Sequence, residues 1–576
     1  MSFKSSLGLD ISRTSDESFL PKYYLNGTDQ VTNAKVGRGV GQRDYWVFEN
    51  YLSYNDKFGD HTVSTMVGTS AEKERYETVN ASKEGLVNND ANQQIINAAT
   101  KNPAASGSVS YHTMNSYFGR VFYSYADKYM ITANIRWDGS SNFADKHRWG
   151  VFPSVSGGWN FREESFIKDV VGDWFSQGKF RAAWGEIGNQ NISSGAYLTR
   201  YGNSTYYLLG NSMTPWLSGG RTNVGNPDLR WETTRQLDFG LDLAFFNSAL
   251  KFNIDYFDRK TSDMLVQVPM PAAIGLPNTP WSNAGSVKNR GFEFVLDYHG
   301  KIGNDFSYNI AGNISTYKNK VLSLGGGTNI PGKTHLGNQV NTMIEPGKPI
   351  GYFYGYKMDG VFQTQEEINN YRGGPDNTII MPTAEPGDLK FVDLNGDGKL
   401  GEEDRTMIGN PHPDFTFGLT LSGEYKGFDL SMFFQGSVGN DILNILKYDI
   451  YSGTGWYNAP KDIFDKFWTG PGSTNENFAI SANSRDNLTM SEWYIENGSY
   501  VRLKNVTLGY TFPKQWVQKL TVQNLRLFVA AQNLFTITSY SGLDPELGNS
   551  NPAFMGIDMG WYPQARSFMV GLSLKL

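Results

Sequence analysis

The chain has 576 residues, of which 14% are aromatic, 63 are Gly and none is Cys, and its formal net charge is -6. The lack of Cys excludes disulfides, thiol catalysis and thiolate metal sites, and the mild negative charge offers no basic patch for nucleic acid. Hydrophobic residues make up only 39%, which would leave the core of one large globule thin, and no apolar run approaches the roughly 18 residues of a membrane-spanning helix.

Alternation of apolar and polar residues begins at the N-terminus. Phe3, Leu7, Leu9 and Ile11 alternate with polar residues and glycine, which is the period of a β-strand with one apolar face. The segment lacks the apolar stretch of a signal peptide. We therefore expect the chain to begin inside a strand and to be the later part of a longer product.

The same alternation recurs along the chain, for example at 129–138 and 151–162. Hairpins are predicted at 237–257, with a turn at Asn247-Ser248, at 292–314, and at 415–434, with a turn at Lys426-Gly427.

A soluble β-sandwich or solenoid would also alternate, but three features favour a membrane barrel. The strands are about as long as a tilted membrane-crossing strand, roughly 9–11 residues. The polar face is rich in charge and Asn, as a wet lumen would be. Aromatic residues recur at strand ends, where they would form interfacial girdles: Tyr129, Trp137, Phe245, Tyr256, Tyr510 and Phe512.

Connections of two lengths separate the strands, as expected for short periplasmic turns and long external loops. The short ones are predicted at 126–128, 246–249, 300–305, 426–427 and 513–523, and a longer connection with a small helix is predicted at 162–178. The long ones are predicted at 71–115, 188–230, 260–289, 318–413, 436–499 and 536–565. Counting alternately gives about sixteen antiparallel strands, and the last, 566–576, runs inward. The fold class is therefore all-β, a transmembrane antiparallel barrel.

Nine segments resemble signatures of the SusC/RagA family of TonB-dependent outer-membrane transporters, in an order and spacing that cover almost the whole chain. They are Arg136–Phe143 (RWDGSSNF), Trp149–Ser154 (WGVFPS), Trp184–Gln190 (WGEIGNQ), Asn226–Glu232 (NPDLRWE), Asn283–Gly285 (NAG), Asn289–Glu293 (NRGFE), Tyr500–Asn505 (YVRLKN), Ala531–Phe535 (AQNLF) and Gly542–Glu546 (GLDPE).

The resemblance implies a barrel of about 22 strands with an N-terminal plug, about six strands more than the count here. Residues 1–576 are accordingly expected to be one β-barrel domain that lacks the first part of the barrel, the plug and the signal peptide. The resemblance further implies an integral outer-membrane location in a Bacteroidetes-like bacterium and uptake of glycans or peptides. The implied partners are a SusD-like surface lipoprotein and, through the missing N-terminal part, the TonB complex. The alternatives are a passive porin-like channel and a surface binding or adhesion protein.

One segment, Asp393–Asp404 (DLNGDGKLGEED), matches the Ca²⁺-loop pattern D-x-[DN]-x-[DN]-G with an acidic twelfth position. The expected ligands are the side chains of Asp393, Asn395 and Asp397, the backbone carbonyl of Lys399, and the closing carboxylate of Asp404. Gly398 would permit the sharp turn at position six. The alternative is an external turn without an ion, so Ca²⁺ would be structural and no cofactor is required.

Aromatic residues in the long connections could stack on sugar rings or on apolar ligand faces: Trp216, Trp281, Trp456, Tyr457 and Trp493. The alternative is that they pack loops together or seat a partner protein. No catalytic residues are predicted, because the six His residues form no H-E-x-x-H pair and no G-x-S-x-G segment exists. The chain is not expected to be an enzyme.

Overall fold

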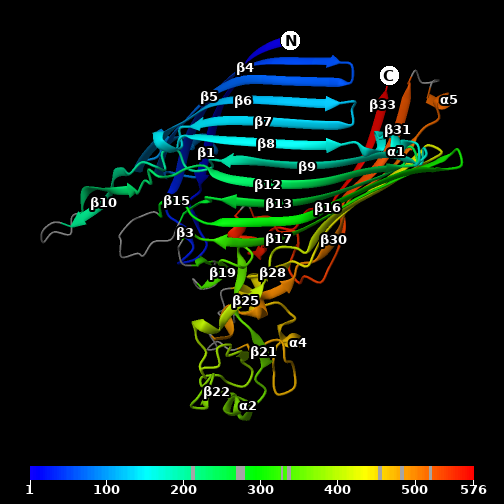
Figure 1. The fold of residues 1–576 in the computed structure, drawn as a ribbon. Coiled ribbons are helices and arrows are strands. Elements are labelled where there is room, and N and C mark those ends of the chain that lie inside the picture. Colours follow the sequence, from blue (N-terminus) through cyan, green and yellow to red (C-terminus); the bar gives the residue numbers. More distant parts are fainter. Residues whose placement is uncertain are drawn as a thin grey trace. The chain divides into compact units, whose positions relative to one another are not determined.

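A computed structural model describes residues 1–208, 215–267, 279–325, 329–333, 339–451, 457–480, 486–517, 522–549 and 551–575, with backbone alone at 203–208, 215–220, 222, 333 and 486. Within these ranges one antiparallel sheet of sixteen strands dominates (Figure 1). In order across the sheet its strands are β1 (Ser2–Leu20), β4 (Ala34–Phe58), β5 (His61–Leu86), β6 (Lys101–Tyr125), β7 (Tyr129–Ser140), β8 (Trp149–Trp159), β9 (Phe175–Asn189), β12 (Glu232–Phe245), β13 (Leu250–Ser262), β16 (Ser286–Ile302), β17 (Phe306–Ser323), β26 (Phe415–Tyr425), β27 (Phe428–Val438), β30 (Tyr500–Thr511), β31 (Asn524–Thr538) and β33 (Ser567–Lys575). The predicted strand number is confirmed.

The remaining described elements lie in the connections. The small sheets are β2 (Tyr23–Tyr24) with β3 (Gln30–Val31); β10 (Arg200–Leu208) with β11 (Pro215–Asn223); β14 (Leu265–Gln267) with β15 (Trp281–Asn283); β18 (Ile330–Lys333), β19 (Val340–Ile344), β20 (Tyr352–Tyr356) and β25 (Arg405–Gly409); β21 (Met358–Val361) with β24 (Leu389–Phe391); β22 (Arg372–Gly373) with β23 (Thr378–Ile379); and β29 (Ile495–Asn497), β28 (Asp441–Asn444) and β32 (Ile557–Asp558). The α-helices are α1 (Ser165–Lys168), α2 (Gln365–Asn370), α3 (Leu446–Tyr451), α4 (Ile463–Lys466) and α5 (Lys514–Val517). Among the described helices, none has the length and apolar character needed to cross a membrane.

The chain divides into two compact units. The first comprises Met1–Gly158, Ala183–Arg235 and Asp263–Ala284, and it contains the longest strands, since β4, β5 and β6 have 25, 26 and 25 residues. The predicted long connection at 71–115 is therefore wrong. Only residues 87–100 connect β5 to β6, and the two strands pair as far as Glu84 with Lys101.

The sequence concealed these strand extensions because their side chains are polar on both faces. Around Thr78, Asn80 and Ser82, polar side chains are interrupted mainly by Val79 and Ala81. Strand segments that extend beyond a membrane meet water on both sides, so the alternation that marks a half-buried strand is lost.

The second unit comprises Trp159–Ala182, Gln236–Ser262 and Gly285–Leu576. Its sheet strands are joined alternately by short turns and long connections, as predicted. The tightest turn is Lys426-Gly427, where both residues have positive φ (+48° and +92°). This is the two-residue turn that matches the twist of an antiparallel hairpin, and Gly tolerates its second position without strain.

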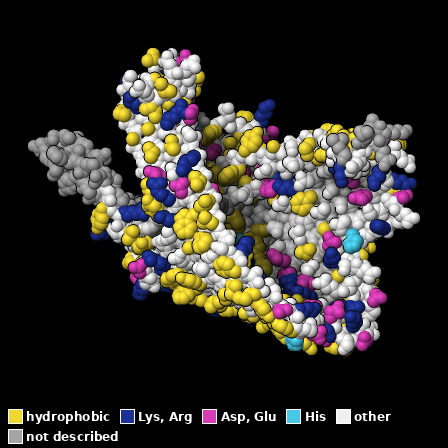
Figure 2. Space-filling view, turned by 90° about the horizontal axis from the view of Figure 1, so that it is seen from above, with side chains coloured by type: hydrophobic (Ala, Val, Ile, Leu, Met, Phe, Trp, Pro, Cys, Tyr) yellow, Lys and Arg dark blue, Asp and Glu magenta, His cyan; other side chains and the backbone are white. Residues whose placement is uncertain are grey.

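One face of the sheet exposes large apolar side chains. In the first unit Leu7, Leu9 and Ile11 are 62–67% exposed, and in the second unit Phe568 and Val570 on β33 are 74% and 75% exposed. Figure 2 shows many such hydrophobic side chains at the molecular surface. Soluble proteins rarely expose apolar area on this scale, whereas a strand face in contact with lipid requires it.

In the second unit the long connections fold into one hydrophobic core, which we call the loop core. It is built mainly from 353–409, 443–494 and Ile557, and its most buried side chains include Phe353, Phe362, Phe391, Leu443 and Tyr494. Figure 1 shows β21, β22 and α2 of this region lying away from strands β16 and β17. These connections are therefore folded structure and not loose loops.

Candidate functional site

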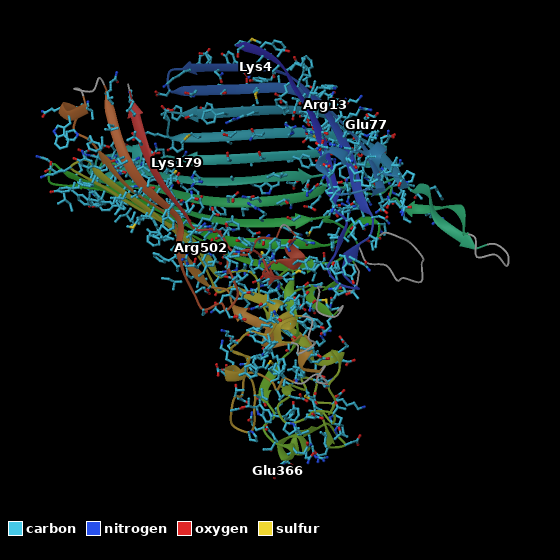
Figure 3. The ribbon with its side chains drawn as sticks, turned by 180° about the vertical axis from the view of Figure 1, so that it is seen from behind. Lys4, Arg13, Glu77, Lys179, Glu366 and Arg502 are labelled. Atoms are coloured by element: carbon cyan, nitrogen blue, oxygen red, sulfur yellow. The ribbon has the colours of Figure 1, made fainter. Side chains whose placement is uncertain are left out.

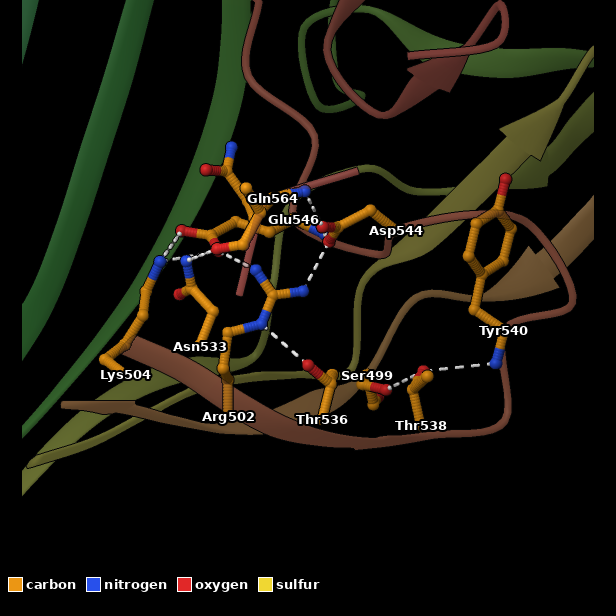
Figure 4. A network of polar contacts seen from close by, with 11 residues as sticks. Ser499, Arg502, Lys504, Asn533, Thr536, Thr538, Tyr540, Asp544, Glu546 and Gln564 are labelled. Carbon is orange, nitrogen blue, oxygen red and sulfur yellow. Dashed lines mark hydrogen bonds and ion pairs between the residues drawn. The ribbon is translucent and has the colours of Figure 1, made fainter. Parts of the chain in front are cut away.

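A buried ion-pair network fastens the connection after β31 to the sheet strands β30 and β31 (Figure 4). Arg502 of β30 has a side chain only 3% exposed and donates hydrogen bonds to Thr536 (2.7 Å), Asp544 (2.5 Å) and Glu546 (2.5 Å). Lys504, two residues along β30 and past the irregular register there, donates to both carboxylate oxygens of Glu546 at 2.7 Å. We call these residues the Arg502 network.

The carboxylate of Asp544 is fully engaged in this network. Besides Arg502, it accepts the backbone N–H groups of Glu546 and Gln564, each at 2.9 Å. Burial raises the pKa of Asp544, but these two amides and the guanidinium favour the charged form more strongly, so the net pKa is below the usual value. A buried carboxylate with this many donors stays ionised and holds the connection in one geometry.

A second polar cluster joins the connection before β30 to the one after β31. Glu496 of β29 accepts hydrogen bonds from Asn444 (3.0 Å) and from the backbone and hydroxyl of Ser541 (2.9 and 2.8 Å), and it pairs with Lys447 at 3.0 Å. Nearby, Tyr540 donates to Asp558 at 2.6 Å. Burial raises the pKa of Glu496, yet Lys447 and the Ser541 donors bring the net pKa below its usual value.

Arg502 is the third residue of β30, at the end of the sheet that joins the folded connections. Figure 3 shows Arg502 on its strand near that level, while Glu366 of α2 lies at the far end of the loop core. The sequence motifs Tyr500–Asn505 and Gly542–Glu546 contain both halves of the Arg502 network, but they served only as family signatures and gave no sign that they meet. The available signal for this contact was opposite charge: the first motif carries Arg and Lys, and the second carries Asp and Glu.

Of the five predicted loop aromatics, the structure describes the side chains of Trp281, Tyr457 and Trp493, and these three lie in different surroundings. Trp493 is 6% exposed at the centre of the loop core, where it donates from Nε1 to Asn477 (3.0 Å) and packs against Phe478 (4.9 Å between ring centroids) and Tyr494. That is the packing role given above as the alternative. Tyr457, by contrast, is 62% exposed.

Of the other three aromatics, two lie in small sheets of the first unit and one lies outside the described residues. Trp281 of β15 is half-buried against a small core that contains Phe143, Leu229 and Trp231. Trp216 lies in β11, paired with Tyr207 through the backbone, and its side chain is outside the described set. Trp456 falls outside the described residues altogether.

The Asp393–Asp404 loop folds with the predicted sharp turn. Gly398 has φ +86°, and a Cβ there would lie 2.5 Å from the carbonyl oxygen of Gly373, so only Gly fits. Asp404 closes the loop from a fully buried position. Its Oδ1 accepts the amides of Leu394 (2.9 Å) and Asn395 (3.2 Å), and its Oδ2 accepts that of Gly401 (2.7 Å).

The other predicted side-chain ligands also accept amides of the loop. Asp393 accepts from Gly396 (2.6 Å) and Gly398 (2.8 Å), Asn395 from Asp397 (2.8 Å), and Asp397 from Lys399 (2.9 Å). Within the described ranges, no three His, Cys, Asp or Glu side chains are grouped so as to hold a metal ion. Asn395 and Asp397 retain free acceptor capacity, whereas a cation would compete with backbone amides for Asp393 and Asp404.

The chain is similar to TonB-dependent receptors over most of its length. Residues 2–534 match the family described as TonB dependent receptor-like, beta-barrel. TonB-dependent receptor P3 of Formosa agariphila is 34% identical over all of this chain and 56% of its own length. TonB-dependent receptor SusC of Bacteroides thetaiotaomicron is 31% identical over 91% of this chain and 49% of its own. The chain spans about half the length of these curated relatives.

The solved structures agree at the level of fold. A structure of the RagAB peptide transporter superposes with a TM-score of 0.83, at 22% identity, over 99% of this chain and 59% of that one. The RagAB peptide importer in an open-open state gives 0.81 over 100% of this chain.

Proposed function

This chain belongs to the TonB-dependent receptor β-barrel family, and from that premise we propose that it forms the barrel wall and external connections of a SusC-like nutrient importer. Barrels of this kind are integral to the outer membrane of Bacteroidetes, and the exposed apolar strand face fits that location. The observation that carries the proposal is the loop core, a folded assembly built from the long connections. The connection after β31, which contributes Ile557 to this core, is fastened to the sheet by the Arg502 network.

Such an arrangement suits ligand capture. A rigid wall that carries a folded external assembly can present a shaped surface to a ligand or to a partner protein. In the proposed mechanism the external connections and a SusD-like surface lipoprotein hold the ligand, and the TonB complex supplies the energy for uptake. We propose peptides or glycans as ligands, because RagAB, whose fold the chain shares, is a peptide transporter and the SusC/RagA resemblance implies both ligand classes. Loop aromatics such as Tyr457 stay candidates for ligand contact. We propose no catalytic role.

The proposal is tested by uptake through the full-length receptor with its neighbouring surface lipoprotein, in a strain lacking both. We expect labelled oligopeptides or oligosaccharides to enter, and entry to stop when TonB is deleted or a protonophore is added. Steady ion conductance in planar bilayers that needs no energy would instead support a porin. Ligand binding without any uptake would support an adhesion or binding protein.

Ca²⁺ binding by the Asp393–Asp404 loop stays a prediction. Because the loop is already held by its own amides, binding should be weak, with a Kd of about 10⁻⁴–10⁻³ M, as in other extracellular modules. Isothermal calorimetry on folded receptor should record Ca²⁺ uptake at millimolar concentration, and Asp397→Ala should remove it, because Asp397 supplies a side-chain oxygen without closing the loop. Absence of any heat from the unaltered protein would contradict the prediction.

A further inference from the structure

Strands β13, β16 and β17 carry a cluster of positive charge on the sheet face that bears the apolar side chains. Cross-strand pairs share a face, and Tyr256, Phe292 and Thr316 form one such row across the three strands. The next two rows of that face, toward the long connections, are charged. They are Asp258, Arg290 and Lys318, followed by Lys260, Lys288 and Lys320. We call these six residues the basic rim.

The positive charge of the rim is only partly neutralised. Lys288 pairs with Asp258 at 2.7 Å. For the other four cations, Lys260, Arg290, Lys318 and Lys320, the described part of the chain offers no ion pair, and all four are exposed. Like charges opposite one another on neighbouring strands repel, so the rim favours a bound anion.

The rim also adjoins a space that an amphiphile could enter. Arg290 and Lys318 line a pocket of about 360 Å³ together with Tyr256 and Phe292, whose rings are 5.1 Å apart, and with Thr316 and Asp414. Below it on the same face lie Ile254, Phe294 and Ile314. Cationic and apolar groups are therefore stacked in the order in which a phospholipid presents its headgroup and its chains.

Strands β26 and β27 stop one row short of the rim. Phe415, the first residue of β26, lies opposite Thr316, and Val438, the last residue of β27, lies opposite Phe415. The charged rows of β16 and β17 therefore extend past these two neighbouring strands.

We propose that the basic rim binds the phosphate headgroup of an outer-leaflet lipid whose acyl chains lie on the apolar rows below. The cations contact the phosphate at the headgroup level, as long cationic side chains do at membrane interfaces. This inference rests on the outer-membrane location and the sheet register, and it is independent of which ligand is transported.

The test uses the full-length receptor in detergent and three probes: phosphorylated lipid A, dephosphorylated lipid A and inorganic phosphate. The rim variant combines Arg290→Gln, Lys318→Gln and Lys320→Gln, which keep most of the side-chain length. The matched control combines Lys251→Gln, Lys301→Gln and Lys426→Gln, which remove the same charge near the short turns of the same strands and of the β26–β27 hairpin.

We expect the unaltered receptor to bind phosphorylated lipid A, and the rim variant to bind it about a hundredfold more weakly, since each surface cation contributes roughly fivefold. The control should stay within about twofold. Equal loss in both variants, or equal binding of dephosphorylated lipid A, would overturn the proposal. Displacement of the lipid by low-millimolar inorganic phosphate would assign the rim to a free anion and would overturn it as well. Should the triple variant fail to fold, Lys318→Gln alone is compared with Lys301→Gln, with a fivefold difference expected.

Discussion

Arg502→Met should release the connection after β31 from the sheet, at a cost of about 3–5 kcal/mol to its docking. The substitution leaves the buried carboxylate of Asp544 without its guanidinium partner, and Thr536 and Glu546 lose a donor at the same time. Amide hydrogen exchange on the full-length receptor should show loss of protection across 540–566 by a factor of 100 or more, while β13 and β16 keep theirs.

The matched control is Arg526→Met. Arg526 pairs with Asp429 at 2.5 Å near the short-turn end of the sheet, but both side chains are more than a quarter exposed (29% and 27%). Ion pairs open to solvent contribute about 0–1 kcal/mol, so exchange should change little. Equal losses of exchange protection in the two variants would mean that burial of the Arg502 network has no effect on the free energy of docking.

Acid should weaken the same attachment in the unaltered protein. The pKa of Asp544 is lower in the folded state than in the unfolded chain, so its stabilising contribution is complete above the unfolded value, about 3.9. That contribution is lost as the pH falls through the lower folded value. In Arg502→Met, burial without the guanidinium raises the pKa of Asp544, so the loss of protection should begin at a higher pH.

Trp493→Ala should unfold or loosen the loop core by about 3–5 kcal/mol. The side chain is 6% exposed and contacts Tyr451, Phe467, Phe478 and Tyr494. Its removal leaves a large cavity and takes away the donor to Oδ1 of Asn477. Limited proteolysis should then cut the connections 339–409 and 441–497 at far lower protease concentration, with the sheet strands unaffected.

Tyr457→Ala is the control for this substitution. Tyr457 also lies in the connection before β30, yet it is 62% exposed, and surface truncations usually change stability by less than about 0.5 kcal/mol. If Trp493→Ala left proteolysis unchanged and instead weakened ligand binding, the packing role would be wrong and a ligand contact would replace it.

The sheet was predictable because its signal is local. Strands such as β12 and β13 alternate along their own length, and their turn lies at Asn247-Ser248 as the sequence suggested. The extensions of β5 and β6 were missed because strand pairing in water requires no apolar face. The family resemblance could be recognised from the sequence because its motifs are distributed along the chain, and the comparisons confirmed it.

The loop core and the Arg502 network could not be predicted in the same way. Arg502 and Asp544 are 42 positions apart and meet only because β31 returns the chain. Trp493 looks in the sequence like any exposed loop aromatic, and only the contacts of the folded connections distinguish it from Tyr457. Irregular segments have no periodicity, so burial within them depends on tertiary packing alone.

The connection 324–414 has a kinetic consequence for assembly. Hydrogen bonding of β26 to β17 must close a segment of about 90 residues, at an entropic cost of roughly 4 kcal/mol. The pairing of β26 with β27 closes only the two-residue turn Lys426-Gly427, so its entropic cost of loop closure is far smaller. A loop core that forms early would shorten the effective distance between the ends of β17 and β26 and so offset that cost. Lesions in the loop core should then slow the insertion of the barrel into the membrane, even where the finished sheet is unchanged.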